Sequence, residues 1–129
     1  MRQDFRQFSV VDPFGRSWDV ELRWIQNAIS IRHADAVDCK YYISHGEEKM
    51  ERVIALPHAG LGAAARRHER EISDAWCIRL AGLHLEHMLS TWEDMDKTIV
   101  TVPQADLDRH ASTLAEAAAE LLRKAALTR

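Results

Sequence analysis

The sequence is poor in cysteine and contains no long apolar run. Its 129 residues include only Cys39 and Cys77, which are too few for a disulfide framework and lack CxxC spacing, so we expect reduced thiols. No segment approaches the roughly 18 consecutive apolar residues of a membrane helix, and the polar residues 1–4 are unlike the start of a signal peptide. These absences predict a cytoplasmic chain that does not enter the membrane.

Neither sign of charge dominates. Lys and Arg total 17 and Asp and Glu total 20, which gives a formal net charge of -3. A dedicated nucleic-acid-binding protein usually carries a strongly basic face. The basic stretch at residues 66–70 contains Glu69 and has no aromatic residue for base stacking. We therefore do not expect nucleic acid as a partner.

Length and composition indicate one α+β domain over residues 1–129. The chain is 47% hydrophobic and 29% charged, which is too apolar for disorder and fits a single core. Residues 1–57 are predicted to form an antiparallel β-meander. Residues 58–129 are predicted to be mainly helical, with residues 98–102 as a short strand or an extended connector.

Alternation of apolar and charged residues predicts the strands. In residues 17–25 the apolar side chains fall on every second position, which is the period of a half-buried strand. About five strands are expected, at residues 5–11, 17–25, 28–34, 37–44 and 48–56. One face is predicted to be the core face, made of Phe8, Val10, Trp18, Val20, Leu22, Trp24, Ile29, Ile31, Tyr41 and Ile54.

Three turns are predicted to set the strand registers. Residues 13–15 fit a three-residue loop that ends in a left-handed glycine, and this loop pairs Val10 with Trp18. A two-residue loop at 26–27 pairs Glu21 with Arg32, because the alternative register would oppose two arginines. A third loop at residues 45–46 sets Lys40 opposite Glu51, again by charge pairing.

The second half shows helical periodicity. Helices are expected at residues 61–71, 75–90 and 103–127, with Ser73 as the N-cap of the second. The helix at 75–90 is apolar around most of its circumference and should be mostly buried. About three helices are thus expected to pack on the apolar face of the sheet.

The terminal helix carries a seam of alternating leucine and alanine. Its members, spaced four and three residues apart, are Leu107, Ala111, Leu114, Ala118, Leu121 and Ala125. Alanine buries little area, so an isolated helix of this kind is marginal and needs a partner. That partner is either the rest of the same chain, or a second copy or another protein.

The motif content favours a non-catalytic function. The chain has no HExxH string, glycine-rich phosphate loop, GxSxG elbow or zinc knuckle, so the sequence assigns no catalytic residue. Together with the seam, this predicts a small interaction or regulatory domain that associates with a protein partner or with itself through the helix at 103–127.

Seven histidines support a rival hypothesis, a divalent-metal-binding protein or metal-dependent enzyme. Alternate turns of a meander lie at opposite ends of the sheet, so the predicted topology gathers four potential ligands at the Asp12 end and leaves His45 at the other. Those four are His33, Asp35, Asp38 and His58, and imidazole with carboxylate suits a divalent transition metal. No other cofactor is predicted.

His84 and His87, three residues apart on the helix at 75–90, are further candidate metal ligands. The competing interpretation of all six residues is structural. It makes the aspartates turn residues and makes His84 a buried neutral histidine bonded to the backbone.

Overall fold

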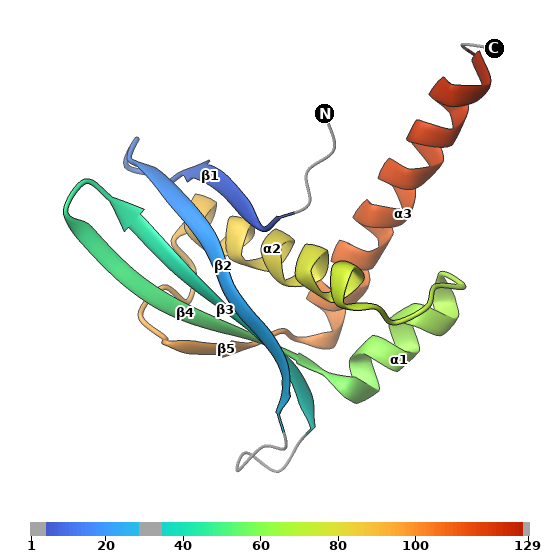
Figure 1. The fold of residues 1–129 in the computed structure, drawn as a ribbon, viewed down its shortest axis with the longest axis horizontal. Helices are drawn as coiled ribbons and strands as arrows, with labels where there is room; N and C mark the ends of the chain where they lie inside the picture. The colour runs from blue at the N-terminus through green and yellow to red at the C-terminus, as the bar shows by residue number, and fades with distance from the viewer. Residues whose placement is uncertain (1–4, 29–34, 128–129) are drawn as a thin grey trace.

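The computed structural model describes residues 5–28 and 35–127. In these ranges the chain folds into an open five-stranded sheet followed mainly by helices, which confirms the α+β class. The elements are β1 Gln7–Val11, β2 Ser17–Ala28, β3 Ala36–His45, β4 Glu48–Pro57, α1 His58–Arg67, α2 Asp74–Thr91, β5 Ile99–Thr101 and α3 Gln104–Leu127. Strands lie in chain order; β1 to β4 are antiparallel and β5 is parallel to β4. Figure 1 shows α2 along one face of the sheet and α3 rising away from it.

The first hairpin forms in the predicted register, with Val10 opposite Trp18. Its turn is held by the buried carboxylate of Asp12, which accepts hydrogen bonds from the Phe14 amide at 2.8 Å and from the Trp18 indole at 2.9 Å. The same carboxylate forms an ion pair with Arg16, whose Nε lies 2.7 Å from Asp12 Oδ2. Burial alone would raise the pKa of Asp12, but the bonds from Trp18 and Arg16 hold that pKa well below its ordinary value. The carboxylate therefore stays charged and fixes the turn.

Arg16 also ties this hairpin to the end of α2. Its guanidinium carbon lies 5.2 Å from the centroid of the Trp18 ring and 5.0 Å from that of Trp92. Trp92 is the C-cap of α2 and has a left-handed φ of 63°, an unusual conformation for a bulky residue. The aromatic contacts with Arg16 help to hold it there.

The predicted turn at 26–27 is wrong. Both residues lie inside β2, which continues to Ala28 and pairs directly with β3. Glu21 consequently lies opposite Tyr42 and not opposite Arg32. Pairing of opposite charges could only distinguish registers of the hairpin with its loop at 26–27, and this hairpin does not form. Residues 29–34 of the predicted third strand, including Ile29 and Ile31, lie outside the described residues.

A β-bulge places Trp24 on the opposite face from Trp18. The register shifts between Leu22, which pairs with Tyr41, and Trp24, which pairs with Lys40. Paired residues share a face, and the Lys40 amine lies 5.9 Å from the Trp24 ring centroid. The prediction of Trp24 in the core is therefore wrong, because one extra residue reverses the alternation. We call the face that carries Trp24 the outer face of the sheet.

The hairpin between β3 and β4 closes one residue later than predicted. Its loop is Gly46–Glu47, with Gly46 at φ 58° in the first central position, as in a type II′ turn. Lys40 therefore lies opposite Val53 and not opposite Glu51. The predicted ion pair still forms diagonally, with Lys40 Nζ 3.1 Å from Glu51 Oε2. Because the loop lies one residue later, each residue of β3 pairs with a β4 residue two positions beyond the predicted one, and a shift by two keeps every side chain on its predicted face.

The helices lie near their predicted positions. Helix α1 begins at His58, three residues before the predicted start, and α2 matches its predicted range within one residue at each end. Ser73 caps α2 as expected, accepting from the Trp76 amide at 3.2 Å. The sixth predicted strand exists as β5. In the described ranges, none of the helices combines the length and hydropathy needed to span a bilayer.

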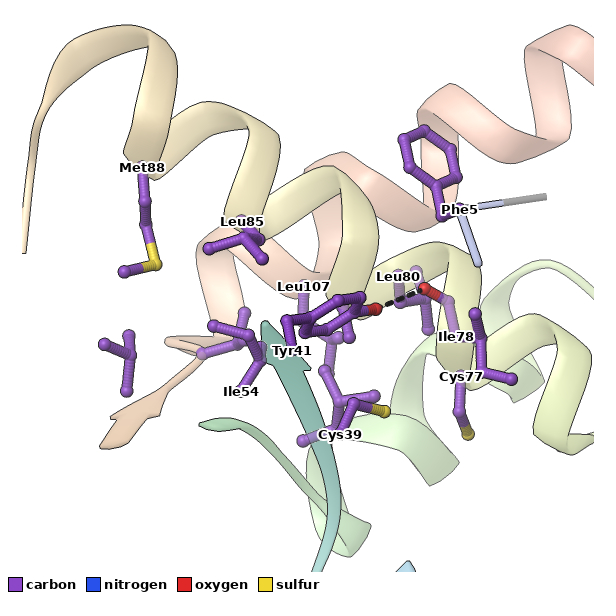
Figure 2. Packing of buried hydrophobic residues seen from close by; sticks show 14 of the residues in the cluster. Phe5, Cys39, Tyr41, Ile54, Cys77, Ile78, Leu80, Leu85, Met88 and Leu107 are labelled. Atoms are coloured by element: carbon purple, nitrogen blue, oxygen red, sulfur yellow. Dashed lines mark hydrogen bonds between the residues drawn. The ribbon is translucent and has the colours of Figure 1, made fainter. Parts of the chain in front are cut away.

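The core lies between the sheet and α2 and extends to the start of α3. Figure 2 shows Tyr41 and Ile54 from the sheet among buried side chains of α2 and Leu107 of α3. The Tyr41 hydroxyl donates to the Ile78 carbonyl at 3.3 Å. Helix α3 approaches α1 so closely that a Cβ on Gly60 would lie 2.9 Å from Leu107 Cδ2. The first turns of α3 are thus part of the core.

Candidate functional site

The direct pairing of β2 with β3 changes which residues share an end of the sheet. The Asp12 turn and the Gly46–Glu47 turn lie at one end, where His45 Nδ1 is 2.8 Å from the Ser17 carbonyl oxygen. Asp35 and His58 lie at the other end, where the His58 amide donates to the Asp35 carbonyl at 3.0 Å. The prediction that these two residues lie at the Asp12 end, away from His45, is therefore wrong.

The candidate metal ligands of the sheet are only partly brought together. Asp35 and His58 are adjacent and exposed, and His58 Nε2 lies 3.0 Å from Asn27 Oδ1. Asp38 is buried on β3, and His33 lies outside the described residues. Within residues 5–28 and 35–127, no three His, Cys, Asp or Glu side chains are arranged to hold a metal ion. The metal hypothesis stays a prediction, which metal analysis of untagged protein would test.

His84 and His87 have different partners. His84 is 3% exposed, and its Nδ1 lies 3.1 Å from Nε2 of His110 on α3. His87 lies nearer the surface, with Nε2 3.0 Å from Glu93 Oε2. The structural interpretation of His84 was right about burial, but its partner is an imidazole and not the backbone. His110 was missed, although its place beside Leu107 and Ala111 in the seam could have indicated it.

The His84–His110 pair is neutral at pH 7. Burial lowers the pKa of both rings, that of His110 to about 4, and a charge on His84 lowers the pKa of His110 further. Asp106 raises and Arg109 lowers both pKa values, by smaller amounts. One neutral ring donates its N–H to the unprotonated nitrogen of the other. This bond is a buried polar link between α2 and α3.

Neither cysteine has the surroundings of a nucleophile. Cys39 is 0% exposed and Cys77 2%, which confirms both as small buried apolar residues. Burial raises the pKa of the Cys39 thiol far above its ordinary value and that of Cys77 to about 11. The reactive thiolate is therefore disfavoured at both positions.

The outer face of the sheet carries two open hollows of about 420 and 610 Å³, which share Glu21, Tyr42 and Ser44. Ser44 has no imidazole among the lining residues to activate its hydroxyl. The carboxylates and the Tyr42 ring suit polar contacts with a partner better than they suit covalent catalysis.

The seam of α3 is covered at its start and exposed beyond. Leu107 and Ala111 are buried, and Leu114 packs against the edge of the core. Further along, Leu121 is 46% exposed and Leu122 is 73% exposed. We call residues 114–127 the outer half of α3. In Figure 1 it projects from the body of the molecule toward the C-terminus.

The sequence left two partners open for the terminal helix, its own chain or another one. The fold is compatible with both, because the first half of α3 docks within the chain and the outer half exposes leucines. No family model, curated protein or solved structure matches the chain significantly.

Proposed function

We propose that this chain is a small, non-catalytic interaction domain that associates with itself through the outer half of α3. The observation that carries the proposal is the continuity of the seam. Leu107 and Ala111 are buried against α1 and α2, Leu114 packs at the edge of the core, and the same stripe then continues to Leu121, which is 46% exposed. A pattern that ends in solvent is typical of a helix that binds another helix.

The energetics favour a weak complex. Full burial of one leucine side chain contributes about 1.5–3 kcal/mol, and of the three exposed leucines of the outer half two lie on or beside the seam, Leu121 at 46% and Leu122 at 73% exposure, whereas Leu127 lies on the other side of the helix. Association costs about 4–15 kcal/mol in lost translational and rotational freedom. The balance corresponds to dissociation constants of micromolar order or weaker.

The fold lowers one part of that cost. A free helix of this length would have to pay for nucleation. Here the first turns of α3 are anchored by Leu107 and by the His84–His110 bond, so the outer half continues a helix that already exists. A preformed binding element loses less entropy on association.

Most of the described histidines support a non-catalytic role. His45, His58, His84, His87 and His110 each have a partner for one ring nitrogen within the chain, whereas Nε2 of His68 and Nε2 of His84 are buried without a hydrogen-bond partner. An imidazole engaged in this way serves the fold and has to give up a contact to act on a substrate.

Light scattering on the full chain and on a chain ending at Thr113 tests the proposal. The shorter chain keeps Leu107, His110 and Ala111 and should retain the core, which circular dichroism would verify. The full chain should gain mass as its concentration rises from the micromolar to the millimolar range, and the shorter chain should remain monomeric. A full chain that stays monomeric up to millimolar concentration would contradict the proposed function.

A further inference from the structure

The direction of pairing can be inferred from the order of residues in the seam; this inference rests on the proposed self-association. We propose that two copies pair antiparallel along the outer halves of α3. The two-fold axis passes between the layers formed by Ala118 and Leu121, so that Ala118 of each copy packs on Leu121 of the other.

The side-chain volumes of the seam match best when two copies of α3 pair antiparallel. The seam of the outer half alternates strictly: leucine stands at 114, where it is half-buried at the edge of the core, and at 121, where it is exposed, and alanine stands at 118 and 125. In a parallel pair, equivalent residues meet and give Leu–Leu layers next to Ala–Ala layers. In an antiparallel pair, unlike seam positions meet, so every layer joins one leucine to one alanine. Uniform layers avoid the voids and the crowding that interiors tolerate poorly.

The register follows from this match. Leu114 lies opposite the partner's Ala125 and Ala118 opposite the partner's Leu121. Exchanging the two copies then leaves every pair of residues unchanged, as a two-fold interface requires. Beside the seam, Leu122 comes to lie next to the partner's Ala115, which covers the 73% exposed Leu122 side chain.

The body of each chain restricts the direction in which two copies can pair. Leu107 and Ala111 lie on the seam side of α3 and are covered by the body of their own chain, so the body occupies the seam side of the first half. Parallel pairing would place both bodies at the same end, between the two helices. Antiparallel pairing places each body beyond the end of the partner helix, because the outer half extends about 21 Å at 1.5 Å per residue.

The charges of the outer half lie away from the seam. Glu116 and Arg123 lie on the opposite side of the helix, and Arg123 pairs with Glu120 within the same helix. Antiparallel pairing leaves this polar face in solvent and breaks none of its contacts. A second copy of this chain therefore fits the seam without stranding a charge.

Charge substitutions in the full chain, followed by sedimentation velocity, test the direction. Ala118→Glu and Leu121→Lys should each weaken association by about tenfold or more, since each places one charge in an apolar layer. The double variant should associate again where the single variants are monomeric, because Glu and Lys then meet in both layers. Ala119→Glu is the matched control, the same change one residue away and off the seam, and it should leave association unchanged. Thermal unfolding of each variant confirms folding.

The outcomes distinguish the direction of pairing, the position of the interface and self-association itself. If the double variant associates no better than the single ones, the antiparallel direction is overturned while self-association stands, because a parallel pair would oppose like charges. If Ala119→Glu disrupts as strongly as Ala118→Glu, the seam is not the interface. If the unsubstituted chain never associates, the proposed function itself fails.

Discussion

Acid should weaken the fold through the buried His84–His110 pair. The pKa of His110 is lowered by burial from 6.5 to about 4, and that of His84 is lowered as well. A histidine whose pKa is lower in the folded state takes up its proton more readily when unfolded. Stability is therefore unaffected well above pH 6.5 and falls as the pH drops from about 6.5 toward 4.

The size of this loss follows from the shift of His110. A difference of one pKa unit corresponds to 1.36 kcal/mol, so a shift from 6.5 to about 4 corresponds to about 3 kcal/mol as an upper value. Asp12 also loses its contribution in acid, but its pKa is lowered from 3.8 and its effect begins below about pH 4. Burial raises the pKa of Glu86 from 4.5, which opposes part of the loss in the same range, so the contribution of the histidine pair is isolated by comparison with a variant that lacks both rings.

Urea denaturation between pH 7.5 and 4.5 measures the effect. The free energy of unfolding of the unsubstituted chain should fall across this range by most of the amount that the pKa shift of His110 corresponds to. The double variant His84→Leu with His110→Leu should lose much less, because neither leucine takes up a proton. It should still fold, because replacing both partners of a buried polar pair by apolar residues leaves neither unsatisfied. His58→Gln, at an exposed histidine, is the control and should keep the slope. An unchanged slope in the double variant would refute the assignment.

Three further predictions concern the turn, the core and the thiols. Asp12→Asn should lower the melting temperature clearly more than Asp19→Asn, because Asp12 is a buried acceptor for Trp18 whereas Asp19 is exposed. Gly82→Ala should destabilise by about 1–3 kcal/mol, because its Cβ would lie 2.3 Å from Phe5 Cβ, whereas Gly62→Ala meets only ordinary contacts and should be neutral or stabilising; urea denaturation distinguishes them. Both cysteines should be unreactive toward a thiol reagent in native protein and titrate fully in denaturant, and rapid native labelling would contradict their burial.

Local patterns predicted much of the fold. The Asp12 turn, the Ser73 cap and the apolar periodicity of α2 each depend on residues close in sequence, and each is confirmed. The errors arise where the pattern does not record backbone irregularity. An extra residue between Leu22 and Trp24 reverses the face of the strand, and nothing in the alternation distinguishes it from a regular strand.

The candidate sites were harder to predict because they depend on the paths of whole elements. The predicted turn at 26–27 changed which end of the sheet held Asp35 and His58. The contact of His84 with His110 depends on how α3 crosses α2, which periodicity does not specify. The seam of α3 was recognisable from sequence, but the point where its cover ends, between Leu114 and Leu121, required the packed structure.

Sedimentation equilibrium of the full chain tests the proposed self-association most directly. The weight-average mass should rise from the 14.8 kDa of one chain toward twice that value as concentration increases, and it should stay at one chain's mass for Ala118→Glu. A mass of one chain at every concentration, or an equal rise in the Ala118→Glu variant, would contradict the proposal.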